Sequence, residues 1–222
     1  MAQQNDAMRT MLRNLKVLEG PFLNANLDTL PDTPQAAFVV WFEEVVKAGV
    51  KEPHAMTLST VDEQGRPDAR VLILKNVDNR GWHFAIKSSS PKGHQIAGNS
   101  HVALTFHWRE IGRQVRIRGK AVKLAEEECF QDFTERPLSS KVIAIASKQS
   151  QVLHDSDELA LSVEQAKSAM ANEPEKFLPA WAVYAVRPES VELWQGAKDR
   201  LHERLQFVSR PDGSWEKQHL WP

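Results

Sequence analysis

Apolar and polar residues alternate along this chain with two different periods, and each period predicts one type of element. Helical spacing follows Pro34, where Phe38, Trp41 and Val45 fall on one face. From residue 55 a period of two, typical of half-buried strands, takes over. The predicted strands are AMTLSTV, DARVLILKNV, WHFAIK, HVALTFHW and RQVRIRGKAVKL between residues 55 and 124, and WAVYAV, SVELWQ, RLQFVS and WEKQHLW from residue 181 onward. Further helices are predicted over 90–99 and over roughly 125–135, 140–146 and 155–172.

The order of these elements is typical of an antiparallel barrel. Five strands, a helical insertion and about four more strands follow one another, and helices do not separate the early strands as they do in a doubly wound fold. The predicted fold class is therefore mainly β, a barrel or barrel-like sheet with peripheral helices. Residues 1–33 end in the proline-punctuated stretch GPFLNANLDTLPDTP and are predicted to form an N-terminal arm. Residues 34–222 are predicted to form a single domain.

Composition and charge place the chain among soluble globular proteins. Of its 222 residues, 41% are hydrophobic and 26% are charged, with a net charge of -1, so no overall field attracts nucleic acid or membrane. No apolar run approaches the roughly 18 residues of a membrane span, and the start lacks the apolar core of a signal peptide. The single cysteine, Cys129, fits a reducing compartment and a structural thiol. We expect a cytoplasmic protein without nucleic-acid or membrane partners.

The common catalytic signatures are absent from the sequence. It contains no glycine-rich phosphate loop, no HExxH, no paired CxxC and no GxSxG. The eight histidines are scattered, so we expect no metal site. The candidates for chemistry are therefore basic and polar residues beside strands.

The stretch QGAKDRLHERLQF, residues 195–207, concentrates such basic residues. If residues 200–205 form a strand, Arg200, His202 and Arg204 share one face. Three basic groups on one face repel each other, which predicts an anionic ligand beside them.

Four other segments carry cations and hydroxyl groups. In RVLILK, Arg70 and Lys75 flank an apolar run that is predicted to be buried, and either or both could bind a ligand. The alternative is that both side chains lie at strand ends in water. In SSSPKGHQI a lysine stands at a predicted helix start, which suits a phosphate, although the hydroxyls there also suit ordinary capping. The remaining two are RQVRIRGK, whose basic face is predicted to be solvated, and ERPLSSK with SKQSQ, which contains Arg136, Ser139, Ser140, Lys148, Gln149 and Ser150. Together these segments favour a phosphorylated ligand.

Taken in order, RVLILK, SPKGHQI, RQVRIRGKA, ERPLSSK with SKQS, and WQGAKDRLHER resemble the pyridoxamine 5′-phosphate oxidase family of flavoenzymes. The likeness extends from about residue 52 to the final HLWP. It implies an FMN-binding split β-barrel that forms a homodimer, with two FMN sites between the subunits. It also implies oxidation of pyridoxamine or pyridoxine 5′-phosphate to pyridoxal 5′-phosphate, with O2 reoxidising the flavin to give H2O2.

The resemblance also implies roles for particular residues. Arg200 and His202 are the expected catalytic residues, closing over the substrate ring, and Gln149 and Ser150 are expected to reach the FMN from the partner chain. The expected FMN-binding residues are Arg70, Val71, Leu72, Ile73, Leu74, Lys75, Ala85, Ile86, Pro91, Lys92, Gln114, Gln149, Ser150, Trp194 and Arg204. The expected substrate-binding residues are Lys75, Arg136, Ser140, Arg200 and His202, the first three at the substrate phosphate.

The chain departs from the family pattern at three places. Asp132 stands where the family commonly has a tyrosine that helps bind the substrate phosphate, and Pro91 stands where an arginine is common. The arm lacks the arginine- and tyrosine-bearing motif of well-known vitamin B6 oxidases. The arm and the HWRE segment instead look somewhat like a sister branch that oxidises phenazine precursors. The alternatives are therefore a same-fold FMN oxidase for a phenazine precursor, and a non-catalytic flavin- or haem-binding barrel.

Overall fold

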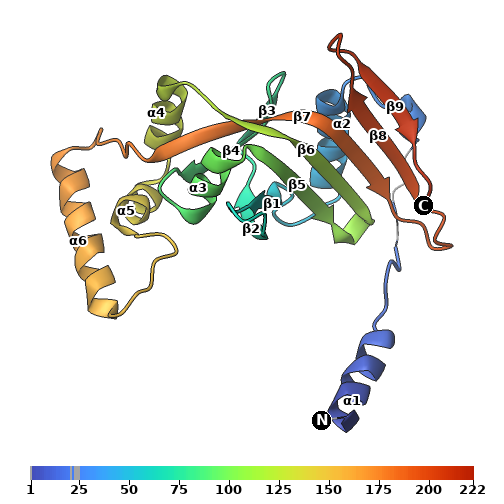
Figure 1. The fold of residues 1–222 in the computed structure, drawn as a ribbon, viewed down its shortest axis with the longest axis horizontal. Helices are drawn as coiled ribbons and strands as arrows, with labels where there is room; N and C mark the ends of the chain where they lie inside the picture. Colours follow the sequence, from blue (N-terminus) through green and yellow to red (C-terminus); the bar gives the residue numbers. More distant parts are fainter. Residues whose placement is uncertain (1, 21, 23–25) are drawn as a thin grey trace.

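A computed structural model describes residues 2–20, 22 and 26–222, and it shows a nine-stranded antiparallel sheet that curls into a half-barrel (Figure 1). The strands run in the order β2-β1-β5-β6-β7-β4-β3, and β8 and β9 extend the sheet from β7. The strands are β1 Ala55–Val61, β2 Pro67–Ile73, β3 Asn76–Asp78, β4 Gly81–Lys87, β5 His101–Trp108, β6 Arg113–Lys123, β7 Trp181–Gln195, β8 Glu203–Ser209 and β9 Trp215–His219. The helices are α1 Ala2–Arg13, α2 Pro34–Lys47, α3 Pro91–Gly98, α4 Glu126–Thr134, α5 Leu138–Ala146 and α6 Ser156–Asn172, with short 3-10 turns η1 Leu27–Thr29 and η2 Arg109–Ile111.

This architecture confirms the predicted mainly β barrel with peripheral helices, with two differences in the strands. The predicted strand over 68–77 is two strands. The Leu74 N–H group still donates to the backbone carbonyl of His54, just before β1, but the Lys75 N–H group donates to the carbonyl of His83 on β4. The predicted strands over 181–186 and 190–195 are one strand, β7.

A bulge between β6 and β7 allows β7 to continue through Pro188. The register shifts between Arg118 and Gly119, so that the proline, which has no N–H group, lies where the ladder is already interrupted. A Cβ atom at Gly119 would lie 2.0 Å from the carbonyl oxygen of Arg187, so the close approach of the strands requires glycine here.

The length of β7 separates two regions of the molecule. Its first half pairs with β4, where Ala85 faces Val183, and its second half pairs with β8, where Arg204 faces Trp194. Val183 and Trp194 are eleven residues apart on one strand, roughly 35 Å at the usual rise per residue. Figure 1 shows β7 crossing the molecule, with α4 and α5 beside its beginning and β8 beside its end.

Helix α2 packs its apolar face into the barrel. Thr33 caps its first turn. Pro34 occupies the first helical position, where an N–H group would have no acceptor within the helix, so its absence is not destabilising. Phe38 lies at the centre of the core, with ring centroids 5.5 Å from Trp82 and 5.0 Å from Phe106. The buried Arg113 of β6 joins the helix to the sheet through Glu44, at 2.6 Å.

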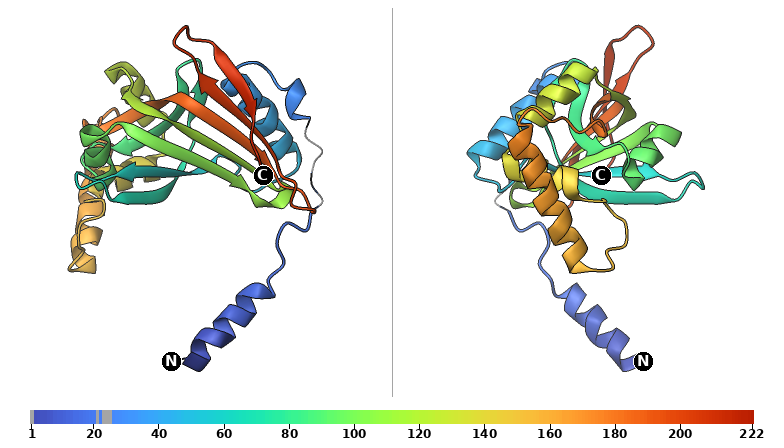
Figure 2. Two further views of the ribbon diagram at one scale, coloured as in Figure 1. Left: turned by 45° about the vertical axis from the view of Figure 1, so that its right-hand side comes forward. Right: turned by 90° about the vertical axis from the view of Figure 1, so that its left-hand side faces the viewer.

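The segment before α2 contains one packed part and one exposed part. Leu27 and Leu30 are buried in the main core, and Lys217 of β9 donates hydrogen bonds to the Leu30 carbonyl and to Asp32. Helix α1 extends away from the sheet in each view (Figures 1 and 2). The division of the chain at residue 33 stays a prediction. Within the described part of the chain, each helix is too short or too polar to cross a lipid bilayer.

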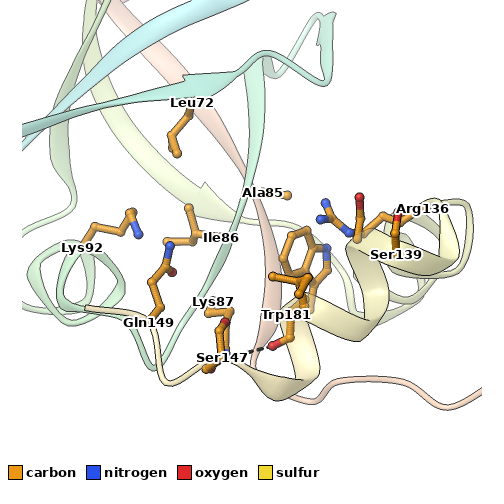
Figure 3. A pocket seen from close by; sticks show the side chains of 13 residues that line it. Leu72, Ala85, Ile86, Lys87, Lys92, Arg136, Ser139, Ser147, Gln149 and Trp181 are labelled. Atoms are coloured by element: carbon orange, nitrogen blue, oxygen red, sulfur yellow. Dashed lines mark hydrogen bonds between the residues drawn. The ribbon is translucent and has the colours of Figure 1, made fainter. Parts of the chain in front are cut away.

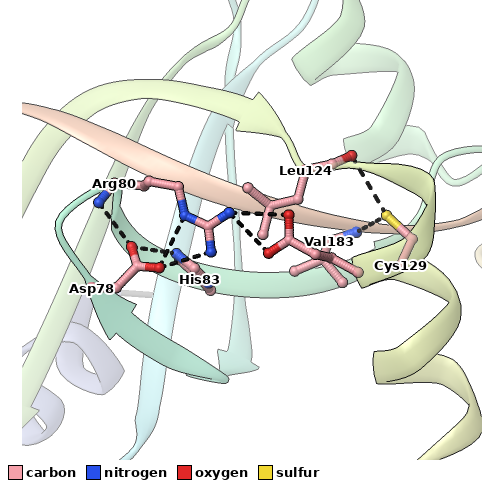
Figure 4. Close-up of polar contacts among 7 residues, drawn as sticks. Asp78, Arg80, His83, Leu124, Cys129 and Val183 are labelled. Atoms are coloured by element: carbon pink, nitrogen blue, oxygen red, sulfur yellow. Dashed lines mark hydrogen bonds and ion pairs between the residues drawn. The ribbon is translucent and has the colours of Figure 1, made fainter.

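A polar network fixes α4 beside the β3–β4 hairpin (Figure 4). Arg80 bonds the carboxylate of Asp78 in its own hairpin and both oxygens of Glu128 on α4, the latter at 2.8 and 3.0 Å. At the next residue, the buried Cys129 thiol accepts the N–H group of Val183 on β7. Helix α4 is therefore held against the beginning of β7 by contacts on both sides.

Candidate active site

A cleft of about 440 Å³ opens where α3, α5 and the loop after α5 meet β4 and the beginning of β7. Cations, hydroxyl groups and an apolar wall converge on it, as Figure 3 shows. Its lining consists of Leu72, Ala85, Ile86, Lys87, Lys92, Arg136, Ser139, Ser140, Ile143, Ala144, Ser147, Gln149 and Trp181.

Two cations gather at the α3 end of the cleft. The Lys92 side chain is 94% buried, and its amine has the Ser90 hydroxyl as a partner at 3.3 Å. Arg70 reaches towards the same helix, donating to Gln95 at 3.2 Å and to Thr60 at 2.6 Å, and its guanidinium also pairs with the carboxylate of Asp68. Burial lowers the pKa of Lys92, and the Arg70 charge lowers it further. The Asp68 charge offsets part of this effect, and the remaining positive charge beside a helix start forms a suitable site for an anion.

Arg136 and two serines supply the polar groups at the α4–α5 end. The Arg136 guanidinium stacks on the Trp181 ring, 4.2 Å from its centroid, and its buried Nε has no hydrogen-bond partner among the described residues. Burial lowers the pKa of Arg136, and the negative charge of Asp132 offsets part of that effect. Ser139 and Ser140 line the cleft beside it. An unsatisfied buried donor next to hydroxyl groups suits an anionic or polar ligand.

Asp132 connects these residues to Lys75. One carboxylate oxygen of Asp132 lies 3.1 Å from the Lys75 amine, and the other accepts the Trp181 indole N–H at 2.8 Å. Lys75 lies outside the cleft lining and instead borders an apolar hollow beside Phe42 of α2. The Asp132 carboxylate therefore pairs with Lys75, an arrangement that the sequence did not suggest.

Six lining residues are absent from the expected cofactor and substrate sets: Lys87, Ser139, Ile143, Ala144, Ser147 and Trp181. Lys87 donates to the carbonyl oxygens of Ala144 and Ser147 at 2.8 and 2.5 Å, and burial lowers its pKa. The alternation in WHFAIK could have identified Lys87 as a lining residue, because a period of two places it on the same face as Ala85.

A second set of expected site residues lies at the other end of β7. Gln114, Trp194 and Arg204 face each other across β6, β7 and β8. Arg204 is held by Glu192 and by the carbonyl oxygen of Trp221, the latter at 2.8 Å.

The expectation that residues 200–205 form one strand is wrong for its first part. Strand β8 begins at Glu203, and Arg200 has a left-handed backbone with φ of 70°. His202 therefore precedes the strand, where its ring packs at a tilt of 48° against Trp194, with the ring centroids 4.8 Å apart. Its Nδ1 accepts the backbone N–H group of Ala197 at 3.1 Å.

The remaining expected cofactor residues surround the first cleft without lining it. Leu74 packs against the core, while Val71 and Ile73 on β2 are exposed and point away from Leu72. Pro91 is exposed at the first position of α3. Gln149, expected from the partner chain, lines the cleft of its own chain, and Ser150 lines an adjacent hollow. Within one chain, Lys92 and Arg136 therefore lie in the same cleft, whereas Gln114, Trp194 and Arg204 lie far from it.

Comparisons with solved structures define the class of protein. A crystal structure of PhzG from Burkholderia lata 383, in complex with tetrahydrophenazine-1-carboxylic acid, superimposes with a TM-score of 0.85, is 29% identical and covers 91% of this chain and 98% of its own. A protein from Nostoc punctiforme, described as pyridoxamine 5′-phosphate oxidase-related and FMN binding, shares the fold at 13% identity with a TM-score of 0.71. The fold is a split barrel.

Sequence comparisons give the family. Residues 42–169 match the family described as Pyridoxamine 5′-phosphate oxidase, and residues 181–222 match the Pyridoxine 5′-phosphate oxidase C-terminal dimerisation region. The pyridoxine/pyridoxamine 5′-phosphate oxidase 1 of Ralstonia nicotianae is 40% identical over 90% of this chain and 95% of its own. The corresponding oxidase of Pseudomonas savastanoi pv. phaseolicola is 42% identical over 86% and 90%. The chain belongs to the pyridoxamine 5′-phosphate oxidase family, whose members are oxidases, and the dimerisation region points to a homodimer.

Proposed function

We propose that this protein is an FMN-dependent oxidase that converts pyridoxamine or pyridoxine 5′-phosphate to pyridoxal 5′-phosphate, with O2 as the electron acceptor and H2O2 as the second product. The observation that carries the proposal is the cleft with cations at both ends. Lys92 lines one end and Arg136 the other, and Leu72, Ala85 and Ile86 form an apolar wall between them. Arg70, itself paired with Asp68, reaches the helix that carries Lys92. Such a cleft suits two phosphate-bearing ligands with flat rings.

The residues present fit FMN. Among the described residues, the buried Lys92 amine has a hydroxyl partner and no carboxylate bonded to it, although the Asp68 charge acts on it; its charge is therefore available to a phosphate. Arg70 and the backbone N–H group of Lys92 would hold the same phosphate, since Pro91 has no N–H group and that of Gly93 donates to Ser90, and the apolar wall would contact the ring. When bound, FMN supplies a two-electron acceptor, which none of the amino-acid side chains provides.

A homodimer would complete the site. Trp194 and Arg204 lie roughly 35 Å along β7 from the cleft wall, too far to touch an FMN held by Lys92 of the same chain. Both lie within residues 181–222, which match a dimerisation region. We therefore place Trp194, Arg204, Arg200 and His202 of the partner subunit over the cleft of each chain.

The side chains of this protein would position the substrate and its protons. Arg136, Ser139 and Ser140 would bind the substrate anion, and Trp181 would form an aromatic wall beside it. Because Nδ1 of His202 accepts the Ala197 N–H group, a neutral His202 carries its proton on Nε2 and presents a hydrogen-bond donor. His202 would then orient a substrate oxygen or ring atom, and the exposed Arg200 would close over the ring and exclude water.

Flavin reduction tests this proposal directly. The purified protein, reconstituted with FMN, should bind about one flavin per chain, and anaerobic addition of pyridoxamine 5′-phosphate should bleach it. Admitting O2 should restore the flavin colour and yield H2O2 and pyridoxal 5′-phosphate. A protein that cannot bind FMN would contradict every oxidase function, whereas a flavin that stays oxidised with both vitamin B6 substrates would reject only this substrate class.

A second candidate is oxidation of a reduced phenazine-type acid. The Asp132–Lys75 ion pair favours it, because it removes a cation from the region where a phosphate would bind. The likeness to PhzG, which was crystallised with tetrahydrophenazine-1-carboxylic acid, supports it as well. Bleaching by a reduced phenazine carboxylic acid, but not by vitamin B6 compounds, would establish this alternative. A non-catalytic flavin- or haem-binding barrel would bleach with neither, and the unpaired, buried Nε of Arg136 in the cleft would then have no explanation among the described residues.

A further inference from the structure

Asp132 occupies a position between two cations at the α4–α5 end of the cleft. Its side chain is 18% exposed and contacts the Lys75 amine with one oxygen and the Trp181 indole with the other. Trp181 in turn carries the stacked guanidinium of Arg136. These four residues form one continuous chain of contacts from outside the cleft to its lining.

The pairing changes the charge that a ligand meets in this part of the cleft. Arg136 lines the cleft with Ser139 and Ser140, whereas Lys75 is neutralised by Asp132 and does not line it. Two cations and one carboxylate leave a net charge of about +1 on this cluster. A carboxylate close to a bound dianion repels it, and it repels a monoanion half as strongly.

We propose that Asp132 determines the specificity of this anion site, by holding Lys75 outside the cleft and disfavouring a phosphate dianion relative to a group with a single negative charge or none. The inference rests on the proposed function only in treating the cleft as the substrate site. The Asp132 carboxylate would thus select between phosphorylated and unphosphorylated aromatic ligands.

Unreactive analogues of the substrate provide the test. The probes are 4-deoxypyridoxine 5′-phosphate and unphosphorylated 4-deoxypyridoxine, which lack the group to be oxidised. Their affinities for the FMN-loaded protein are measured by titration calorimetry at a pH where the phosphate is a dianion. The variant is Asp132→Asn, which keeps an acceptor for Trp181 and releases Lys75. The control is Glu135→Gln, an equal change of charge at the exposed end of the same helix.

The expected result is specific to the phosphate. Asp132→Asn should tighten binding of the phosphorylated analogue about tenfold, the effect of one added charge-assisted contact, and leave the unphosphorylated one within about twofold. Glu135→Gln should change neither affinity. Adding Lys75→Met to Asp132→Asn should remove the gain, because Lys75 supplies the new contact.

Four results would overturn the inference. They are unchanged or weaker binding of the phosphorylated analogue by Asp132→Asn, equal tightening of both analogues, a gain that survives Lys75→Met, and failure of both analogues to bind any variant. The last result would also remove the vitamin B6 function, whereas the first three would leave it standing if anaerobic bleaching succeeds. If Asp132→Asn does not fold, Asp132→Ser replaces it in both the single and the double variant: a gain for the phosphorylated analogue that Lys75→Met removes supports the inference, and no gain overturns it.

Discussion

Glu192 holds Arg204 in a fixed position: its Oε1 accepts hydrogen bonds from Nε of Arg204 at 3.0 Å and from Nη2 at 2.8 Å. The third nitrogen of the guanidinium reaches the carbonyl oxygen of Trp221. Glu192 is 93% buried, and Arg116 bonds its other oxygen at 3.1 Å. A planar fork with several donors is needed to make these contacts together, and lysine lacks that geometry.

We therefore expect Arg204→Lys to lower FMN affinity by about tenfold or more, because the cation would lose its position beside the flavin. The measurement is the fluorescence of free FMN during titration of the flavin-free protein. Arg210→Lys is the control, since Arg210 is exposed and pairs with Glu216 near the β8–β9 turn. Equal affinities for the Arg204 variant and the control would show that Arg204 supports the sheet and does not bind the cofactor.

Subunit mixing tests whether the two sets of residues meet between chains. Lys92→Met damages one set and Trp194→Ala the other, and each homodimer should bind FMN poorly. In a mixed dimer one site contains both substitutions and the other contains neither. Random exchange of subunits should therefore restore FMN binding to about a quarter of the sites. Absence of recovery, with exchange demonstrated by differently tagged chains, would mean that each flavin is bound by a single chain.

The sequence predicted the strands well because the sheet is half-buried and its alternation is strong. The prediction was wrong at residues 200–202, because the alternation in RLHERLQF begins three residues before the start of β8. Leu201 has the spacing of a buried residue but is 68% exposed, because the left-handed Arg200 and the Asp199 carboxylate, which accepts the Leu201 N–H group, turn the chain first. Local pattern does not report such a turn at a residue other than glycine.

The candidate site was predictable as a set of residues but not as an arrangement. The pairing of Ala85 with Val183 joins segments almost a hundred residues apart, and the Asp132–Lys75 pair likewise depends on tertiary packing. Family resemblance suggested which residues bind ligands. It could not show that Lys75 would be paired with a carboxylate, because the partner stands at a position where this chain departs from its relatives.

Lys92 should make FMN binding sensitive to alkaline pH. The free lysine has a pKa below its ordinary value, mainly through burial, and only the protonated amine attracts a phosphate. FMN affinity should therefore fall as the pH rises from about 7 towards the ordinary lysine value of about 10.4, earlier than for an exposed lysine. Lys92→Met should bind FMN more weakly, with little change over the same range. An identical slope in both proteins would assign the titration to another group.

Asp78 should stabilise the fold at neutral pH but not in acid. Burial raises the pKa of its carboxyl, but hydrogen bonds from Arg80 and the charge of His83 outweigh burial and bring the pKa below its ordinary value. The folded pKa is thus below the unfolded one, so the stabilisation is present above about pH 4 and is lost as the pH falls through the folded value. Asp78→Asn should lower the free energy of unfolding by about 1–2 kcal/mol at pH 7 in urea, and by less near pH 3. Glu63→Gln, in an exposed turn, should have no effect, and an Asp78 variant that loses equal stability at both pH values would contradict the ion-pair explanation.

Arg200 should affect turnover without affecting the cofactor. Its side chain is exposed on a loop whose backbone contacts, from Arg200 N–H to Ala197 and from His202 N–H to Arg200, use main-chain atoms that an alanine retains. Arg200→Ala should therefore keep the loop and the FMN affinity, and lower the rate of anaerobic flavin bleaching by about a hundredfold or more, because the group that closes over the substrate is lost. Lys198→Ala, at an exposed position of the same loop, is the matched control and should bleach at the rate of the unaltered protein. Loss of flavin from the Arg200 variant would instead assign this arginine to the cofactor, and an unchanged bleaching rate would remove it from the site.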